Sequence, residues 1–358
     1  MRQAPWRRLV ISAALAAVVI LAALVGGRVA KYRRIQAVPI LMYHHIWNVA
    51  NSAWCVPPDV FERQMKFLCD RGYTSILPAD LAAHQRWGAP LPSRPVIITL
   101  DDGYLDSLTV AEPILRKYGL RGIVYLMTDS IGATPDQRGQ LEGADCLTWS
   151  EVRAMQGRGT LTFGGHSHAH RNLAVAPDPL FLTRECYRQI LRNGGFIPDS
   201  FCYPFGQYNQ RAMDAVRCAG FGTALACKDA VARTGPNLNL LALPRVSVMG
   251  GRHRFVVTRA RDRESAGEVV FHVRHEGIPI EVTPRLKGIT GDTWLSAREL
   301  RNGAEVEWRW KLKTTFDRDK PLALEIWDKN RILPLYPAWG LLSRSAEREE
   351  GTGIGVMS

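Results

Sequence analysis

Apolar and polar positions follow two different rhythms over residues 36–255. Short runs rich in β-branched residues predict strands, and stretches in which apolar residues return every three or four positions predict helices. The predicted strands are residues 40–43, 74–77, 96–100, 122–127, 161–163 and 200–203. The predicted helices lie between them, at residues 61–71, 111–118, 150–157 and 179–193. Strands and helices that alternate in this way are typical of an α/β fold built on a parallel sheet.

The pattern changes after residue 255. Residues 259–264 are rich in charge and are predicted to form a linker. The strands predicted beyond them are residues 268–275, 278–283, 305–313 and 322–327. In the third of these, apolar and charged side chains alternate with a period of two, which indicates one solvated face. We therefore predict a small antiparallel β-domain over residues 256–342 and a disordered tail over residues 343–358.

An uncharged apolar stretch, LVISAALAAVVILAALVGG, occupies residues 9–27 between two groups of basic residues. It is long enough to span a bilayer, and Arg28-Val29-Ala30 is a poor site for signal cleavage. Residues 1–35 are therefore predicted to be an uncleaved membrane anchor with its juxtamembrane segment. A cleaved signal peptide is the alternative.

The formal net charge of +12 comes partly from this N-terminal segment. The remaining positive charge favours anionic surfaces or polymers. Nucleic acid is not predicted as a partner, because the chain shows no zinc knuckle, basic helix or aromatic RNA-binding motif. The seven cysteines form no Cys-x-x-Cys pattern, so free thiols are expected, with a disulfide between Cys218 and Cys227 as the alternative.

Two adjacent acidic residues, Asp101 and Asp102, follow the apolar run at residues 96–100 and precede Gly103. Neighbouring side chains of a strand point in opposite directions, so one carboxylate can bind a metal while the other faces a substrate. Two like charges this close are costly unless a cation joins them. Asp-Asp-Gly is also an ordinary turn sequence, so this motif alone leaves a structural role open.

The segment FGGHSHAHRNL at residues 163–173 contains His166 and His170, four residues apart. One helical turn would place both imidazoles on the same face. Two imidazoles and a carboxylate leave open metal positions for water and substrate. A solvated histidine-rich loop is the alternative for this segment alone, and the acidic pair makes a metal site the better interpretation.

These motifs resemble a known family. TLDDGY at residues 99–104 and GHSHAH at residues 165–170 are similar to the first two motifs of polysaccharide deacetylases (carbohydrate esterase family 4, NodB-homology domain). FCYPFGQYN at residues 201–209 resembles the third motif, and VPILMYHH at residues 38–45 resembles the branch that deacetylates secreted poly-N-acetylglucosamine. The resemblance covers roughly residues 38–250. It implies a distorted (β/α)7-type barrel over residues 36–255, with the active site at the carboxyl ends of the strands.

The resemblance also implies a set of roles. Asp102, His166 and His170 would hold a divalent metal, with zinc preferred and cobalt or nickel as alternatives, because imidazole ligands disfavour magnesium. Asp101 would be the general base for a metal-bound water, and the backbone N–H of Phe205 would contribute to the oxyanion hole. The predicted activity is metal-dependent removal of N-acetyl groups from a secreted polysaccharide that contains N-acetylglucosamine.

The sequence departs from the family where its third motif begins. Cys202 stands at the position of an arginine that supports the catalytic aspartate in the family. Arg245, which follows Pro244 at a predicted strand end, is predicted to replace it through a bidentate contact with Asp101. A purely structural arginine is the alternative.

The Leu-His of the family's fifth motif, which supplies the general acid, is also absent around residues 241–248. His44 follows the predicted strand 40–43 and is predicted to take this role, since imidazole can be protonated at working pH. The alternatives are a His44 that only hydrogen-bonds at the barrel mouth, His253 as the acid, or metal-bound water with no dedicated acid.

The same site would also serve deacetylation of peptidoglycan or chitin oligomers. A non-catalytic polysaccharide-binding protein is a further alternative, disfavoured because the metal ligands and the base are all present. The resemblance implies that the catalytic part lies outside the cytoplasm, held at the cytoplasmic membrane by the anchor or secreted after cleavage. The expected partners are the polysaccharide, the membrane and the machinery that makes or exports the polymer.

Overall fold

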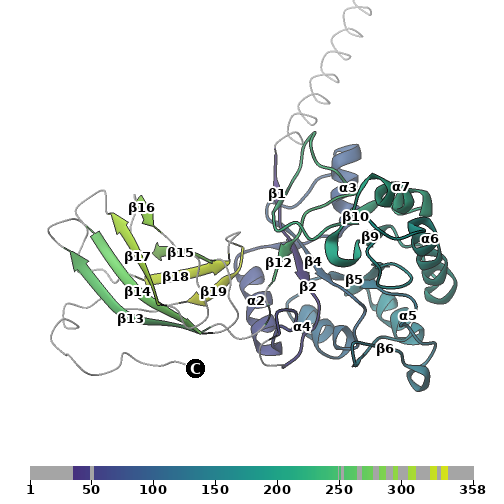
Figure 1. Cartoon of the computed structure of the whole chain (residues 1–358), viewed down its shortest axis with the longest axis horizontal. Helices are drawn as coiled ribbons and strands as arrows, with labels where there is room; N and C mark the ends of the chain where they lie inside the picture. The colour runs from purple at the N-terminus through teal and green to yellow at the C-terminus, as the bar shows by residue number, and fades with distance from the viewer. Residues whose placement is uncertain are drawn as a thin grey trace, which may run out of the picture.

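The computed structural model describes residues 35–48, 52–248, 250, 254–263, 268–276, 282–287, 293–296, 305–311, 323–328 and 332–337. Its first part holds a curled sheet of eight strands that all pair in parallel (Figure 1). In sheet order these are β10 (Thr223–Leu225), β9 (Ser200–Cys202), β8 (Leu161–Gly165), β5 (Gly122–Leu126), β4 (Pro95–Leu100), β2 (Ile40–Tyr43) and β12 (Val246–Ser247), with β3 (Thr74–Ser75) beside β4. The α/β prediction with a parallel sheet is confirmed.

One short segment joins the two ends of this sheet. Leu243 forms a parallel bridge with Leu225 of β10, and three residues later Val246 pairs with Leu41 of β2. The chain thus crosses from one edge of the sheet to the other between residues 243 and 247. This crossing gives the curvature expected of a distorted barrel.

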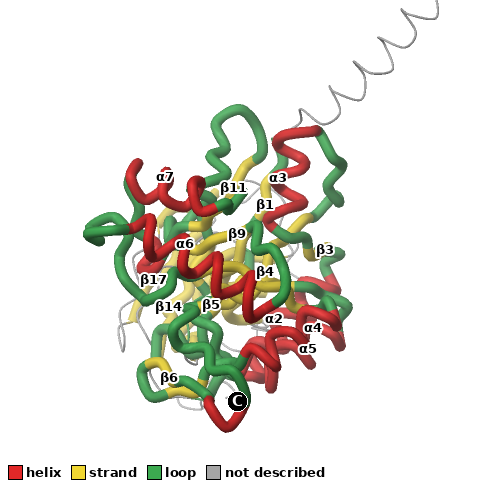
Figure 2. The backbone as a smooth tube through the Cα atoms, turned by 90° about the vertical axis from the view of Figure 1, so that its right-hand side faces the viewer, coloured by secondary structure: helices red, strands yellow, loops and turns green. Residues whose placement is uncertain are grey.

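Helices surround the sheet, as Figures 1 and 2 show. They are α2 (Pro58–Asp70), α3 (Pro78–Trp87), α4 (Glu112–Lys117), α5 (Trp149–Arg158), α6 (Pro179–Gln189) and α7 (Gln210–Ala219). Single π turns precede α4 at Ser107–Ala111 and follow α6 at Ile190–Gly194, and 3-10 turns lie at Pro135–Gln137 and Pro204–Gly206. On α2, the buried residues Phe61, Met65 and Leu68 recur at helical spacing and form the face that packs on the sheet.

Alternate residues of the central strands pack on opposite sides of the sheet. Ile98 and Leu100 of β4 belong to the apolar cluster beneath the helices, whereas Ile97 belongs to the cluster inside the curl. Because side chains alternate along a strand, Asp101 continues the inner row. The same parity in β2 places His44 on the inner side and His45 on the outer side.

Most predicted elements of this part are present with shifted ends. The predicted strand 74–77 is shorter, because Pro78 begins α3 and Leu77 precedes it as the N-cap residue. Helices α3 and α7 were not predicted. Two short antiparallel pairs were also missed, β1 (Ala37–Val38) with β11 (Ala232–Arg233) and β6 (Gln140–Leu141) with β7 (Ala144–Asp145).

The C-terminal part contains two antiparallel sheets (Figure 1). One has the order β13 (Arg254–Arg263), β14 (Glu268–Glu276), β17 (Glu305–Lys311), β16 (Thr293–Ser296), and the other β15 (Val282–Lys287), β18 (Ala323–Asp328), β19 (Pro334–Pro337). The linker predicted at 259–264 is wrong, because its first five residues pair with β14 as part of β13. The strand predicted at 278–283 is displaced to β15. The linker was predicted wrongly because the charged residues of β13 have the composition of a solvent-exposed loop.

Ile332 and Leu333, just before β19, are buried in the apolar cluster that contains Phe61 and Val246. This end of the C-terminal part therefore packs against the curled sheet and its helices.

Among the residues that the structure describes, none of the helices has the length and apolarity needed to cross a membrane. The apolar stretch predicted as an anchor, the predicted tail and His253 lie outside those residues. All seven cysteines are described and are free thiols, so the alternative disulfide between Cys218 and Cys227 is not formed.

Candidate active site

The end of β4 delivers two buried carboxylates into the curl of the sheet. Asp101 and Asp102 are 2% and 5% exposed. Asp102 has a φ of 74° and Gly103 a φ of 78°, so the chain turns sharply as the strand ends. A residue other than glycine rarely adopts this left-handed conformation, and such strain concentrates at functional sites.

Asp102 lies beside the two predicted histidine ligands. Its Oδ1 atom is 3.3 Å from Nε2 of His166 and 3.7 Å from Nε2 of His170. All three residues offer a ligand atom within 4.8 Å of the other two. The structure therefore brings the predicted metal ligands together.

The histidines do not meet through a helical turn, as the spacing suggested. Residues 166–170 are irregular, and Ser167 between them has a φ of 74°. The backbone instead folds over β5 and α6, where Thr128 donates to the carbonyl of Ser167 and His168 donates to that of Leu182.

The tautomer of His166 suits a metal ligand. Its Nδ1 is 2.8 Å from the carbonyl oxygen of Cys202, which can only accept a hydrogen bond. Nδ1 therefore carries the proton, and the lone pair of Nε2 is directed toward Asp102. In metal sites, a hydrogen bond from the other ring nitrogen to a carbonyl commonly orients a histidine ligand in this way.

A divalent cation fits the residues present. Oδ1 of Asp102 is buried and makes no hydrogen bond within the described part of the chain, although an unsatisfied buried oxygen is costly. Burial alone would lower the pKa of His166, but its contact with Asp102 and the charges of both carboxylates outweigh burial and raise that pKa. The pocket thus favours positive charge, and two imidazole nitrogens with one carboxylate form a common donor set for catalytic metals.

Asp101 has a different partner. Nη1 and Nη2 of Arg245 donate to its two oxygens at 2.7 and 2.8 Å, which is the predicted bidentate contact. Arg245 is fully buried and also donates to Thr99 Oγ1 and to the carbonyl of Ala226. Burial would raise the pKa of Asp101, but the charge and hydrogen bonds of Arg245 outweigh it and hold that pKa well below its ordinary value. Asp101 is therefore ionised, as a general base must be.

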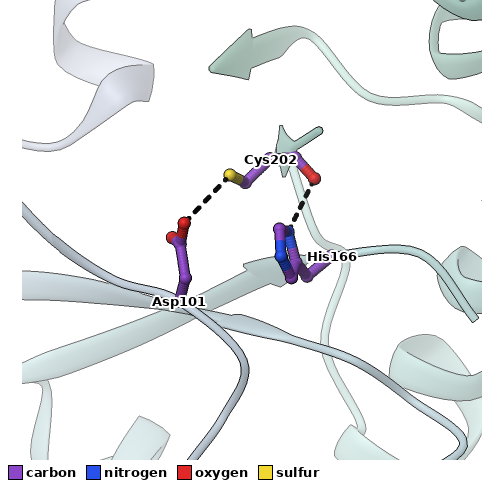
Figure 3. A group of neighbouring side chains, drawn as sticks. All are labelled: Asp101, His166 and Cys202. Atoms are coloured by element: carbon purple, nitrogen blue, oxygen red, sulfur yellow. Dashed lines mark hydrogen bonds between the residues drawn. The ribbon is translucent and has the colours of Figure 1, made fainter. Parts of the chain in front are cut away.

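Cys202 connects the two halves of the site (Figure 3). Its thiol donates to Oδ2 of Asp101 at 3.5 Å, while its carbonyl accepts the proton of His166. Burial raises the pKa of this thiol well above its ordinary value, so the sulfur stays protonated. Asp101, His166 and Cys202 also have ligand atoms within 4.8 Å, but a protonated thiol and a carboxylate neutralised by Arg245 are poor metal ligands.

His44 approaches the same carboxylate from β2. Its Nε2 is 3.8 Å from Oδ2 of Asp101. Burial lowers the pKa of His44 by more than the two carboxylates raise it. His45 faces elsewhere, because its Nδ1 contacts Asp106 at 2.7 Å and its ring stacks on Tyr104. The preference for His44 over His45 therefore agrees with their positions.

Phe205 lies in the 3-10 turn Pro204–Gly206, next to the predicted metal ligand His170. It has a φ of 59°, and its ring centroid is 4.5 Å from that of His170. The ring is more than half exposed. Its backbone is thus beside the metal site, while donation from its N–H to a reacting oxygen stays a prediction.

Trp54, which lies beside the site, was not predicted from the sequence. The ring of Trp54 lies 4.7 Å from that of His44. Trp54 belongs to no motif, and only tertiary structure brings it to the histidine.

A family model for polysaccharide deacetylase matches residues 88–224. This chain contains a domain of the polysaccharide deacetylase family. The match includes the acidic pair, both predicted histidine ligands and Phe205, but it begins after His44 and ends before Arg245. His44 and Arg245 are therefore assigned to the site only because the structure places them in contact with Asp101.

Relatives and solved structures agree with the domain. The Bacillus subtilis (strain 168) protein YxkH, named as a polysaccharide deacetylase, is 26% identical over 211 residues, covering 58% of this chain and 71% of that protein. The Escherichia coli (strain K12) poly-β-1,6-N-acetyl-D-glucosamine N-deacetylase is 22% identical over 336 residues, covering 81% of this chain but only 48% of that protein. The structure of the Streptococcus pyogenes deacetylase PplD with acetate has a TM-score of 0.54 at 22% identity, over 61% of this chain and 94% of that one. The polysaccharide deacetylase domain thus has the fold of known deacetylases.

Proposed function

We propose that this protein is a metal-dependent hydrolase that removes N-acetyl groups from a secreted polysaccharide containing N-acetylglucosamine. The observation that carries the proposal is the pairing of two adjacent carboxylates with different partners. Asp102 meets two imidazoles, whereas Asp101 meets the buried guanidinium of Arg245. The names of the Escherichia coli and Staphylococcus aureus relatives, poly-β-1,6-N-acetyl-D-glucosamine N-deacetylases, support the choice of polymer.

Asp102, His166 and His170 would hold the metal, with zinc preferred and cobalt or nickel as alternatives. When bound, the metal supplies polarisation of the acetyl carbonyl and activation of a water. Asp101 takes the proton of that water, and Arg245 keeps Asp101 ionised and in one orientation. The N–H of Phe205 stabilises the negative charge that develops on the acetyl oxygen.

The departing sugar amine needs a proton as the tetrahedral intermediate collapses. His44 is the nearest candidate, because its Nε2 lies 3.8 Å from Asp101. A histidine here can receive the proton that Asp101 has taken and deliver it to the nitrogen.

The apolar N-terminal stretch supports attachment to the cytoplasmic membrane, with the barrel and a C-terminal β-domain outside the cytoplasm. Secretion after signal cleavage is the alternative. The machinery that makes or exports the polymer is then a further partner. Protease accessibility of the chain in intact cells and spheroplasts tests this placement.

The deciding experiment measures acetate release from poly-N-acetylglucosamine, peptidoglycan and chitin oligomers. We expect release from the first polymer, loss of release after chelation and recovery on adding zinc. Release only from peptidoglycan or chitin would assign the substrate to those polymers. Binding of polymer without any acetate release would contradict an enzymatic function.

Two variants separate the metal site from the base. His170→Ala should lose bound metal, because three protein ligands are the usual minimum for a catalytic zinc site. Asp101→Asn should keep the metal and slow hydrolysis by roughly 10²-fold or more, as expected for loss of a general base. Metal content by atomic emission checks both, and normal metal in His170→Ala would contradict the ligand assignment.

A further inference from the structure

Trp54 is an exposed aromatic residue at the edge of the active site. Its side chain is 52% exposed, and its ring lies 4.7 Å from the ring of His44 at an angle of 53°. Single exposed apolar side chains are common on proteins and need no special function. What distinguishes Trp54 is the support beneath it and the groups beside it.

The turn that carries Trp54 is held from two sides. His45 donates to the carbonyl of Trp54 at 3.1 Å, and Val56 donates back to that of His45 at 2.9 Å. On the other side, Gly250 donates to the carbonyl of Ala53 at 2.8 Å. The turn packs so closely on Gly250 that a Cβ there would lie 2.5 Å from the carbonyl oxygen of Cys55. An aromatic side chain on a fixed turn loses little conformational entropy when it binds a ligand.

The neighbours of Trp54 place it at one end of the reacting groups. Its partner His44 contacts Asp101, the base. At the other carboxylate, Phe205 packs on His170, which contacts Asp102. One exposed aromatic ring therefore stands beside each half of the site. The C–H groups on one face of a hexopyranose form an apolar surface, and such a surface packs well on a flat, rigid aromatic ring.

We infer that Trp54 binds the face of a sugar ring of the polymer and so determines which residue of the chain presents its N-acetyl group to Asp101. This inference rests on the proposed function and extends it to the choice of sugar along the polymer. One side of the indole packs on His44, and the exposed part of the ring receives the sugar.

The test compares two substrates of one enzyme, an N-acetylglucosamine oligomer and an aryl acetate ester that carries no sugar. The measured quantity is the ratio of their kcat/KM values. Trp54→Ala should lower this ratio about tenfold, mainly through KM of the oligomer, which corresponds to ~1.4 kcal/mol of lost binding. Trp54→Leu, which keeps an apolar contact with His44 but not a flat ring, should behave like Trp54→Ala. Trp54→Phe should restore most of the ratio.

Trp87, at the end of α3, is a matched control because it is 81% exposed and has no place in the site. Trp87→Ala should leave the ratio unchanged. An unchanged ratio in Trp54→Ala would overturn this inference but not the proposed function, whether both kcat/KM values stay the same or both fall equally. An equal fall would indicate a role for Trp54 only in positioning His44. Failure of the wild-type protein to release acetate from any oligomer would overturn the proposed function together with this inference.

Discussion

Adjacent carboxylates in this site have opposite surroundings. Asp101 contacts a guanidinium that cannot lose its proton, and Asp102 contacts two imidazoles that can. The first is therefore paired permanently, whereas the second retains capacity for a metal. Two residues of the same type, one peptide bond apart, thus have different chemistry, because Arg245 lies before β12 whereas His166 and His170 follow β8.

Arg245→Lys tests the role of the planar fork. Lysine keeps the charge but cannot donate to both oxygens in parallel, so the contact with Asp101 weakens. Arg245 holds the pKa of Asp101 low, and a general base works only above its own pKa. A weaker contact raises the pKa, so the acid limb of kcat/KM should move to higher pH.

Turnover of Arg245→Lys should fall, but by less than the roughly 10²–10⁴-fold that a general base contributes, because Asp101 is still present. Metal content should not change. A pH profile identical to that of the wild type would show that Arg245 is only structural.

His44→Ala addresses the proton that the amine needs. A general acid must be protonated, so its contribution is lost as pH rises through its pKa, which burial holds below the ordinary value for His44. Removal of His44 should lower turnover roughly 10²-fold and flatten the alkaline limb of the pH–rate profile. An unchanged alkaline limb would return the role to His253 or to metal-bound water.

At the scale of elements, strained turns hold the reactive groups. Asp102, Ser167 and Phe205 all have positive φ, and each follows a strand that ends at the site. Gly206, after Phe205, has a φ of 65° and packs directly on Cys227. Three strand ends thus place their side chains through backbone conformations that ordinary residues avoid.

Gly206→Ala should displace this turn. A Cβ at Gly206 would collide with the backbone nitrogen and Cβ of Cys227, so the turn with Phe205 must shift. Gly119→Ala is the matched control, because its φ of 64° is similar and a Cβ there meets nothing within 4 Å. Both variants carry the cost of a left-handed alanine, about 1–2 kcal/mol. Only Gly206→Ala should also lose acetate release, and equal activity in the two variants would contradict a role for the turn.

The sequence predicted the elements whose pattern is local. Strands β2 and β4 are continuous apolar runs ended by polar residues, and they were placed within one residue. Helices α3 and α7 were missed for different reasons. The apolar residues of α3 show little helical periodicity, whereas α7 has a clear apolar face, with Ala212, Ala215 and Val216 buried, that was overlooked. Charge along β13 was mistaken for a linker because the pairing with β14 that makes it a strand is not local.

The residues of the site likewise fall into those that local sequence patterns predicted and those that only tertiary structure reveals. Motif residues such as Asp102 and His170 were found from spacing, although the helical turn expected between the histidines is absent. The contact of Arg245 with Asp101 was predicted, although Arg245 lies directly before β12 and not at a strand end. Trp54 had no signal, because its turn reaches His44 only through pairing with His45 and Gly250.

At the scale of the whole molecule, the C-terminal part is attached to the core of the deacetylase part. Leu333 is 2% exposed and lies in the same apolar cluster as Phe61 of α2. The two parts therefore share buried surface, and unfolding of one exposes apolar groups of the other.

Leu333→Ala should lower the free energy of unfolding by about 2–5 kcal/mol, the usual cost of this substitution in a core. A denaturant titration monitored by loss of acetate release would measure this change in the stability of the deacetylase part. Leu191→Ala is the control, because Leu191 is 44% exposed and its loss should change stability by less than about 0.5 kcal/mol. Equal midpoints for the two variants would mean that the parts are energetically independent.

The position of Arg245 has a consequence for the timing of activity as the chain emerges and folds. Every predicted metal ligand precedes it in the chain, and it lies directly before β12, the last strand of the curled sheet in sequence order. A chain that emerges from its N-terminus onward therefore presents all three predicted metal ligands before the partner of Asp101. Until the segment that carries Arg245 emerges and crosses to β2, Asp101 lacks the guanidinium that keeps it ionised in the interior. Hydrolysis is thus expected to begin only when the barrel is closed, so that unfinished chains bind metal without attacking an acetyl group.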